Sequence, residues 1–477
     1  MRNGWTVVAA ISAAAVLQAP VAAPSLAEVT RVVVEDSGPM GTFGGRDYLW
    51  VTAHMEGTVA RDDGTTGHYR VPVQLYYPDR NGNGFGFVDV PNNADFASFF
   101  DENAAFGKRQ VFRPGAIVFD DFLQTEGFAY ISVQWHRMVT AALGPEYGVI
   151  ENGLDGYEIV RDAARMLRDP SHFEGELAFG PEAVDHVIGY GYSNTSGLLK
   201  YMAWQGEDRE PDGLLLLDGH MLAPHNGVGC NGLTNDETPR DTPGLPSDPN
   251  FRTGSIPCPD LPGESRIITL RAQGDADGLG PPAQVQPGSR VYDMASVSHI
   301  PTAFVPLINL GASRQNPVSW APVAKAMLRH LVGWITDDAE PPPPRYLAGT
   351  FDSDGGFHVA TDADGNVLGG IRLPNVATEL PNGERAGAPL GVYGGHDEDL
   401  RGPGYGYAHH GGTFDPFSAE ELARRYPTQE VYVDLVEKAA ATLLADGYIL
   451  EEDYEAYVRD AERHSWPLEP GRGPAWW

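Results

Sequence analysis

Positive charge is scarce in this sequence. The 477 residues include 33 lysines and arginines against 65 aspartates and glutamates, which gives a formal net charge of -32. Nucleic acids and anionic membranes attract basic proteins and repel acidic ones, so we expect neither as a partner. The same balance favours a solvated acidic surface, as in a soluble protein.

Long apolar runs are almost absent as well. The one candidate is the N-terminal segment, where Arg2 precedes an alanine- and valine-rich stretch and small residues lead up to Ala27. This order is typical of a secretory signal peptide, and Pro20 and Pro24 argue against a membrane anchor. We predict a signal peptide over residues 1–27 and a periplasmic or secreted mature chain, without membrane contact after cleavage.

Cysteine is also scarce, with Cys230 and Cys258 as the only two. Without nearby paired histidines they do not supply the four ligands of a structural zinc site. In an exported chain they favour one disulfide across a loop of about 28 residues, worth roughly 3–4 kcal/mol.

The stretch DADG from Asp362 lacks the glutamate of a calcium loop, since Leu373 stands at that position, and we expect a β-turn. We therefore expect no metal and no other cofactor.

Strand and helix patterns alternate through the first 340 residues. Residues 46–61 and 68–79 alternate as an antiparallel pair of strands should. Apolar runs then predict further strands, and 3.6-residue periodicity predicts helices between them. The predicted strands are 85–92, 126–135, 185–192, 212–219, 265–275 and 289–299, and the predicted helices are 154–169, 194–205 and 322–338. This order indicates an α/β fold: a mostly parallel sheet with helices on both faces and an antiparallel N-terminal edge.

The composition changes at DDAEPPPPRY, residues 337–346, where four prolines form a stiff connector. We place a catalytic core at residues 28–338 and a C-terminal extension at residues 339–477. The extension has glycine-rich loops and helical segments, one with Ser418 as N-cap and Glu421 three residues later. It is loop-rich, so we expect it to pack on the core.

Ser193 stands where a predicted strand meets a predicted helix, in the segment GYSNTSG. The motif of a nucleophilic serine is G-x-S-x-G, and here Gly191 fits while Thr195 occupies the fifth position. Alone, this pattern favours a helix N-cap or a simple turn over a nucleophile.

Two later segments change that interpretation. Asp275 and Asp277 follow one predicted strand, and His299 follows the next. Serine, acid and histidine, in that chain order and each at a strand end, match the α/β-hydrolase triad. Active groups gather at the carboxyl ends of parallel strands, so we expect these residues to meet.

The predicted roles follow from this order. Ser193 attacks a carbonyl carbon, His299 moves the proton, and Asp275 orients the imidazole, with Asp277 as the alternative acid. The oxyanion hole would use the main-chain N–H of Asn194 and one from Asn92 or Asn93, with Asn93 as our choice.

On these motifs the chain resembles the alpha/beta hydrolase domain family of exported bacterial proteins. The resemblance spans about residues 28–463 and rests on GYSNTSG, RVYDMASVSH, RHLVGWITDDAEPPPP and DADGNVLGGIRLP, of which the last is the most specific. It implies an α/β-hydrolase fold and an esterase activity. The family often has an acidic residue where this chain has Gln273, so the acid here must be Asp275 or Asp277, or the triad is weakened.

The residues favour a serine hydrolase that cleaves a small-molecule carboxylic ester through an acyl-enzyme. Two alternatives stay open at this point: an amidase or peptidase on the same triad, and an inactive ligand-binding protein, which Gln273 favours. The sequence does not indicate the acyl or alcohol group, the oligomeric state, or whether residues 230–258 form a lid.

Overall fold

The computed structural model describes residues 27–60, 66–91, 118–135, 155–170, 182–225, 264–282, 286–300, 315–397, 399 and 408–473. The predictions for the signal peptide up to residue 26, for Asn92 and Asn93, and for Cys230 and Cys258 lie outside these residues. They stay predictions.

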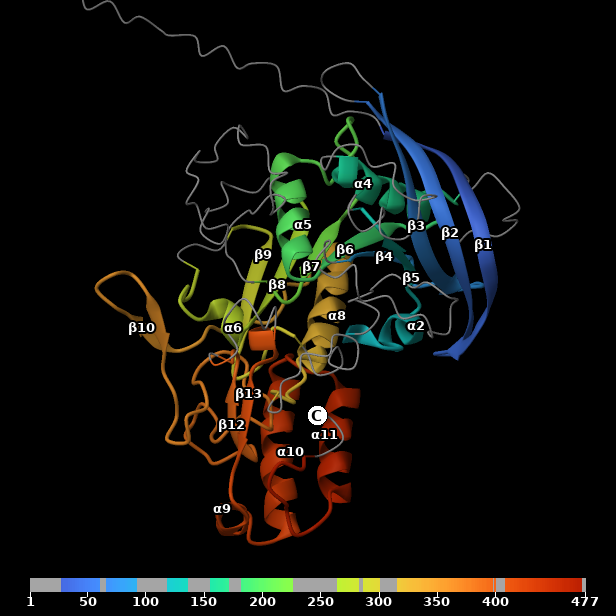
Figure 1. The fold of residues 1–477 in the computed structure, drawn as a ribbon. Helices are drawn as coiled ribbons and strands as arrows, with labels where there is room; N and C mark the ends of the chain where they lie inside the picture. The colour runs from blue at the N-terminus through green and yellow to red at the C-terminus, as the bar shows by residue number, and fades with distance from the viewer. Residues whose placement is uncertain are drawn as a thin grey trace, which may run out of the picture.

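Nine strands in the described residues form one sheet, in the order β1-β2-β3-β5-β4-β6-β7-β8-β9 (Figure 1). The strands are β1 (Ala27–Phe43), β2 (Arg46–Ala60), β3 (Thr66–Pro78), β4 (Phe85–Val90), β5 (Ala129–Val133), β6 (His186–Gly191), β7 (Gly219–Leu222), β8 (Arg266–Ala272) and β9 (Ser289–Met294). The pairs from β1 to β3 and the pair of β3 with β5 are antiparallel, and all pairs from β5 to β9 are parallel. The predicted α/β fold with an antiparallel N-terminal edge is confirmed.

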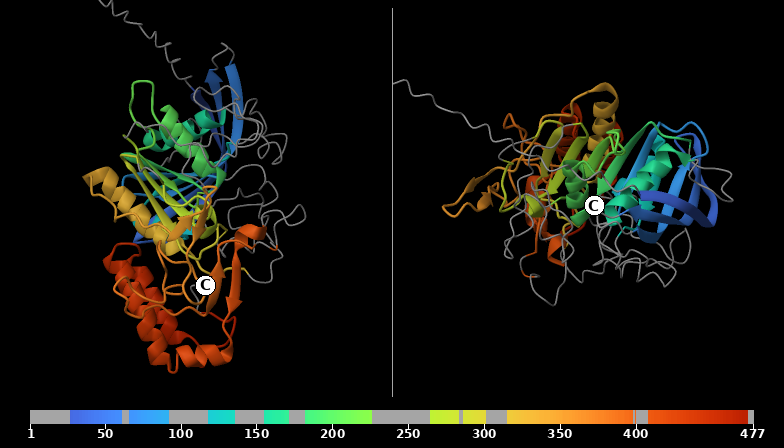
Figure 2. Two further views of the ribbon diagram at one scale, coloured as in Figure 1. Left: turned by 90° about the vertical axis from the view of Figure 1, so that its left-hand side faces the viewer. Right: turned by 90° about the horizontal axis from the view of Figure 1, so that it is seen from above.

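Helices lie on both faces of this sheet (Figure 2). The helices against the sheet are α2 (Phe122–Glu126), α4 (Asp155–Arg168), α5 (Asn194–Gln205) and α8 (Ala321–Asp337). Successive residues of a strand point to opposite faces, and β6 shows this: Val187 packs in one apolar cluster with α4 and α5. Ile188 packs in the other cluster, with α2 and α8. The sheet is therefore buried on both sides, as its apolar parallel strands require.

The predicted strand at residues 212–219 is wrong. The strand at this place is β7, which begins at Gly219, where the prediction ended. The leucines before it form a turn: Leu214 is exposed, and the N–H groups of Leu216 and Leu217 both donate to the carbonyl oxygen of Asp208. A continuous apolar run marks burial but not its backbone conformation, and here Leu216 and Leu217 are buried without a strand.

The first strand, β1, was not predicted. It pairs with β2 over its whole length, but its register shifts at three places, the last between Pro39 and Gly41. Each irregularity breaks the two-residue alternation that reveals a strand. The sequence of this segment therefore lacks the regular alternation from which a strand is predicted.

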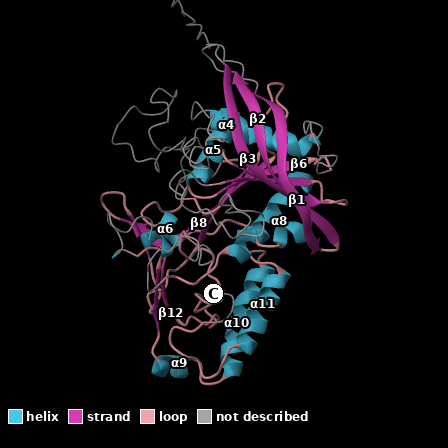
Figure 3. Cartoon of the chain, turned by 45° about the vertical axis from the view of Figure 1, so that its right-hand side comes forward, coloured by secondary structure: helices cyan, strands magenta, loops and turns pink. Residues whose placement is uncertain are grey.

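The helices of the C-terminal extension lie next to α8 and share an apolar cluster with it (Figure 3). Its elements are β10 (Gly349–Phe351), β11 (Phe357–Val359), β12 (Gly391–Gly394), η5 (Ala408–Gly411), β13 (Thr413–Pro416), α9 (Ala419–Arg425), α10 (Gln429–Ala445) and α11 (Glu451–Arg463). Buried side chains of α10 and α11, such as Leu435 and Tyr457, belong to the same apolar cluster as Leu331 of α8. The boundary between residues 338 and 339 stays a prediction.

Two local predictions in the extension can be compared with the structure. The hydroxyl of Ser418 accepts the N–H of Glu421 at 3.2 Å, so the N-cap of α9 is confirmed. The carboxylate of Asp362 accepts the N–H groups of Asp364, Gly365 and Asn366, which makes DADG a turn as expected.

Candidate active site

Ser193 lies between the end of β6 and the first residue of α5. Its backbone has φ of 57° and ψ of −118°, a conformation that residues with a side chain rarely adopt. The N–H of Ser193 donates to the carbonyl oxygen of Pro224 at 2.9 Å, which anchors the turn. A strained serine at a sharp strand-to-helix turn is the geometry that exposes a nucleophilic hydroxyl.

Gly191 and Thr195 explain why the chain can make this turn. A Cβ atom on Gly191 would lie 2.6 Å from the nitrogen of Ser196, so only glycine fits there. The Thr195 hydroxyl accepts the N–H of Tyr192 at 2.9 Å and lies 2.8 Å from the carbonyl oxygen of Val90, at the end of β4. Thr195 thus ties the turn to the neighbouring strand, although it departs from the usual motif.

His299 follows β9 and contacts Asp275 of the single-turn helix α6 (Gln273–Ala276). The Nδ1 atom of His299 lies 2.7 Å from Oδ1 of Asp275, and both side chains are buried. The other carboxylate oxygen of Asp275 accepts the N–H of Ala272 at 3.2 Å. Burial alone would raise the pKa of Asp275, but the charge and hydrogen bond of His299 outweigh it and lower that pKa.

Of the two candidate acids, the structure brings Asp275 against the histidine. Asp277 is exposed, and its N–H donates to the carbonyl oxygen of Gln273 at 2.8 Å. The turn of α6 therefore points Asp275 inward and leaves Asp277 at the surface. Gln273 begins this turn, two residues before Asp275.

Tyr192, the residue before the serine, also holds the histidine. Its hydroxyl donates to the main-chain carbonyl oxygen of His299 at 2.9 Å, and the two rings lie 5.4 Å apart. Full burial raises the pKa of Tyr192 well above its usual value, so it stays a hydrogen-bond donor. Sequence reasoning missed this residue.

Of the predicted oxyanion-hole residues, Asn194 is the first residue of α5. The first N–H groups of a helix have no partner within the helix and are available to an anion. Asn93 lies outside the described residues, beyond the end of β4.

The candidate site residues lie in the part of the chain that matches the model of a known protein family. The family model described as "alpha/beta hydrolase domain" matches residues 118–459, more than half of the chain, and this range includes Ser193, Asp275 and His299. The chain belongs to the alpha/beta hydrolase domain family. The family range continues past residue 338, so it includes most of the extension of this alpha/beta hydrolase.

Solved structures that resemble this alpha/beta hydrolase include three named for ester or lactone chemistry. A CE15 glucuronoyl esterase from Teredinibacter turnerae is 12% identical over 43% of this chain and 46% of that chain, with a TM-score of 0.24. Vibralactone cyclase is 14% identical over 61% of this chain and 82% of that chain, with a TM-score of 0.32. Acetyl xylan esterase 1 from Thermoanaerobacterium sp. is 11% identical over 51% of this chain and 72% of that chain, with a TM-score of 0.25. The chain thus spans less than half of the glucuronoyl esterase. No curated protein matches it.

The extension of this alpha/beta hydrolase brings three further imidazole rings to the site, which the sequence reasoning missed. The ring of His410 lies 5.1 Å from that of His299. His396 and His409 lie 5.2 and 3.8 Å from His410. The sequence shows a glycine-rich stretch with these three histidines. Nothing in that pattern indicates that one of their rings contacts His299.

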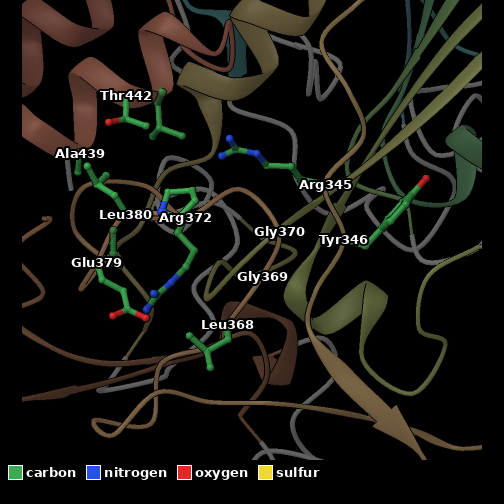
Figure 4. A pocket seen from close by; sticks show the side chains of 13 residues that line it. Arg345, Tyr346, Leu368, Gly369, Gly370, Arg372, Glu379, Leu380, Ala439 and Thr442 are labelled. Atoms are coloured by element: carbon green, nitrogen blue, oxygen red, sulfur yellow. The ribbon is translucent and has the colours of Figure 1, made fainter. Parts of the chain in front are cut away.

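Two cavities lined by described residues lie away from these groups. The larger, of about 380 Å³, is in the extension and includes Arg345, Arg372 and Thr442 (Figure 4). The other, of about 330 Å³, is at the amino ends of β4 and β6, near Gly84 and Asp185. Neither includes Ser193, Asp275 or His299.

In the part of the chain that the structure describes, no three His, Cys, Asp or Glu side chains are grouped to hold a metal ion. Within the same residues, no helix combines the length and the apolar character needed to cross a bilayer.

Proposed function

We propose that this protein is a serine hydrolase that cleaves a carboxylic ester of a small molecule. The contact of 2.7 Å between His299 and Asp275 carries the proposal, together with the strained turn at Ser193. Membership of the alpha/beta hydrolase domain family supports the same reaction class.

In the proposed mechanism, the Ser193 hydroxyl oxygen attacks the ester carbonyl carbon while Nε2 of His299 takes the hydroxyl proton. The Asp275 carboxylate accepts the Nδ1 proton of His299 and stabilises the imidazolium. The imidazolium then gives its proton to the departing alcohol, which leaves an acyl group on Ser193. His299 then takes a proton from water as the water oxygen attacks the acyl carbon, and gives this proton to the Ser193 oxygen as the bond to the acyl group breaks, which releases the acid.

The negative charge on the carbonyl oxygen needs donors that are already in place. We assign the main-chain N–H of Asn194, supported by its position at the start of α5, and that of Asn93. In other serine hydrolases, loss of one such donor costs roughly 3–4 kcal/mol of transition-state stabilisation.

We further propose that the protein is exported to the periplasm or the medium and carries a disulfide between Cys230 and Cys258. The N-terminal pattern and the scarcity of cysteine support this. The charge of -32 supports a small uncharged or cationic substrate over nucleic acid.

The test is hydrolysis of short-chain p-nitrophenyl esters by the wild type and by Ser193→Ala. We expect turnover that the alanine variant loses, because no other group replaces the nucleophile. Ser353→Ala, an exposed serine of the extension, is the matched control and should keep full activity. Turnover of p-nitroanilides without turnover of esters would instead assign amide bonds. No turnover of either would contradict a hydrolase.

A further inference from the structure

The C-terminal extension reaches the candidate base through His410 of η5. The His410 and His299 rings lie 5.1 Å apart and are tilted by 46°, so they are in contact. Tyr192 contacts the same imidazole from the core at 5.4 Å. His299 is therefore held between a ring of the core and a ring of the extension.

Main-chain hydrogen bonds fix η5 at this place. The N–H of Ile300, the residue after the base, donates to the carbonyl oxygen of His410 at 3.0 Å. The N–H of Asn316 donates to the carbonyl oxygen of Gly411 at 3.1 Å. These bonds do not involve the His410 side chain, so substitutions of that side chain leave them in place.

The other groups that face His410 are His299, Asp275, His396 and His409. His396 packs on the loop of the acid, since a Cβ atom on Gly274 would lie 2.5 Å from its Nε2 atom. Burial, with the positive charges that His299 and His409 could carry, lowers the pKa of His410 to about 2. Although Asp275 acts in the opposite direction, His410 is neutral in the pH range where ester hydrolases work.

We propose that His410 is a positioning residue for His299: its ring packs against the imidazole of the base and holds it in one orientation. The inference rests on the proposed function, because it assigns His299 as the base. In the transition state His299 carries a positive charge. A neutral ring beside it tolerates that charge, whereas a cation would oppose it.

Three substitutions separate packing from charge. His410→Ala removes the ring, so His299 gains freedom to turn, and kcat should fall about 10- to 100-fold with little change in KM. His410→Phe restores a flat neutral ring and should recover most of kcat. His410→Arg adds a positive charge about 5 Å from His299, which should move the acid limb of the pH–rate profile down by about one pH unit.

The experiment measures kcat, KM and the pH profile for p-nitrophenyl ester hydrolysis, with a thermal melt for each variant. His358→Ala and His358→Arg are the matched controls, because His358 is an exposed histidine of the same extension, paired with Asp352. They should behave as wild type. The alanine and phenylalanine variants decide the question even where the arginine variant does not fold.

Loss of kcat in His410→Ala with recovery in His410→Phe supports the inference. Wild-type kcat in His410→Ala, or equal loss in both variants, overturns it while ester hydrolysis by the wild type stands. A wild type that neither hydrolyses esters nor reacts with a fluorophosphonate overturns the proposed function, and the inference with it.

Discussion

The Tyr192 hydroxyl donates a hydrogen bond to the main-chain carbonyl oxygen of His299, 2.9 Å away. The residue before the candidate nucleophile thus holds the candidate base, although 107 positions separate them in the sequence. Any movement of the turn at Ser193 moves Tyr192 with it. One hydrogen bond therefore links the turn of the candidate nucleophile to the candidate base.

Tyr192→Phe should lower kcat about fivefold to tenfold and the free energy of unfolding by about 1–2 kcal/mol, because the carbonyl oxygen of His299 loses its donor. Ester kinetics and urea denaturation measure the two effects. Tyr48→Phe is the control, since Tyr48 is buried and donates to the carbonyl oxygen of Phe128. It should lose similar stability but no activity. Equal kcat in both variants would show that the Tyr192 bond does not position the base.

Asp275→Asn should lower kcat by about 10⁴-fold, because the amide favours the wrong tautomer of His299. Asp277→Asn should stay within about threefold of wild type, since a surface carboxylate loses only a weak, screened interaction. Ester kinetics on the pair identify the acid. The reverse result, with Asp277→Asn inactive, would contradict the assignment of Asp275.

Thr195→Val should lower the free energy of unfolding by about 2–3 kcal/mol. Valine keeps the shape but leaves the N–H of Tyr192 and the carbonyl oxygen of Val90 without the Thr195 hydroxyl. Urea denaturation measures the loss. Thr195→Ser keeps the hydroxyl and should recover most of the stability; if it is as unstable as Thr195→Val, the hydroxyl is not what holds the turn.

Lys200→Met should stabilise the protein by about 1–3 kcal/mol at pH 7. Burial, with the positive charge of Arg271, lowers the pKa of Lys200 to about 8 from 10.5 in the unfolded chain. The unfolded chain keeps the proton between these two pH values and the folded chain does not, so wild-type stability rises with pH across this window. The penalty is fully present below pH 8.

Urea denaturation of Lys200→Met at pH 7 and pH 10.5 tests this sign. The gain should be large at pH 7 and shrink at pH 10.5. Lys438→Met, on an exposed part of α10, is the control and should show no gain. A gain of equal size at both pH values would mean that packing of the apolar methionine side chain, and not removal of the buried charge, sets the effect.

Much of the fold could be predicted because apolar residues recur with a different period in strands than in helices. Helix α5 was predicted with its actual bounds, 194–205. The leucine run before β7 was misread because burial and backbone conformation are separate properties, and here Leu216 is buried in a turn. Strand β1 was missed because its irregular register broke the alternation.

The candidate site could be predicted as far as chain order allows. Ser193, an aspartate and His299 each follow a strand, and the carboxyl ends of the strands meet at one edge of a parallel sheet. The choice between Asp275 and Asp277 depends on which way a four-residue helix turns, and two aspartates so close together give the same pattern. His410 could not be foreseen, because its contact with His299 forms only when the extension packs on the core.

The most direct test of the account is peptide mass spectrometry after reaction with a fluorophosphonate. The account predicts a single covalent adduct on the peptide that contains Ser193, absent from Ser193→Ala and strongly slowed in Asp275→Asn. An adduct on another residue, or none on the folded wild type, would contradict Ser193 as the nucleophile.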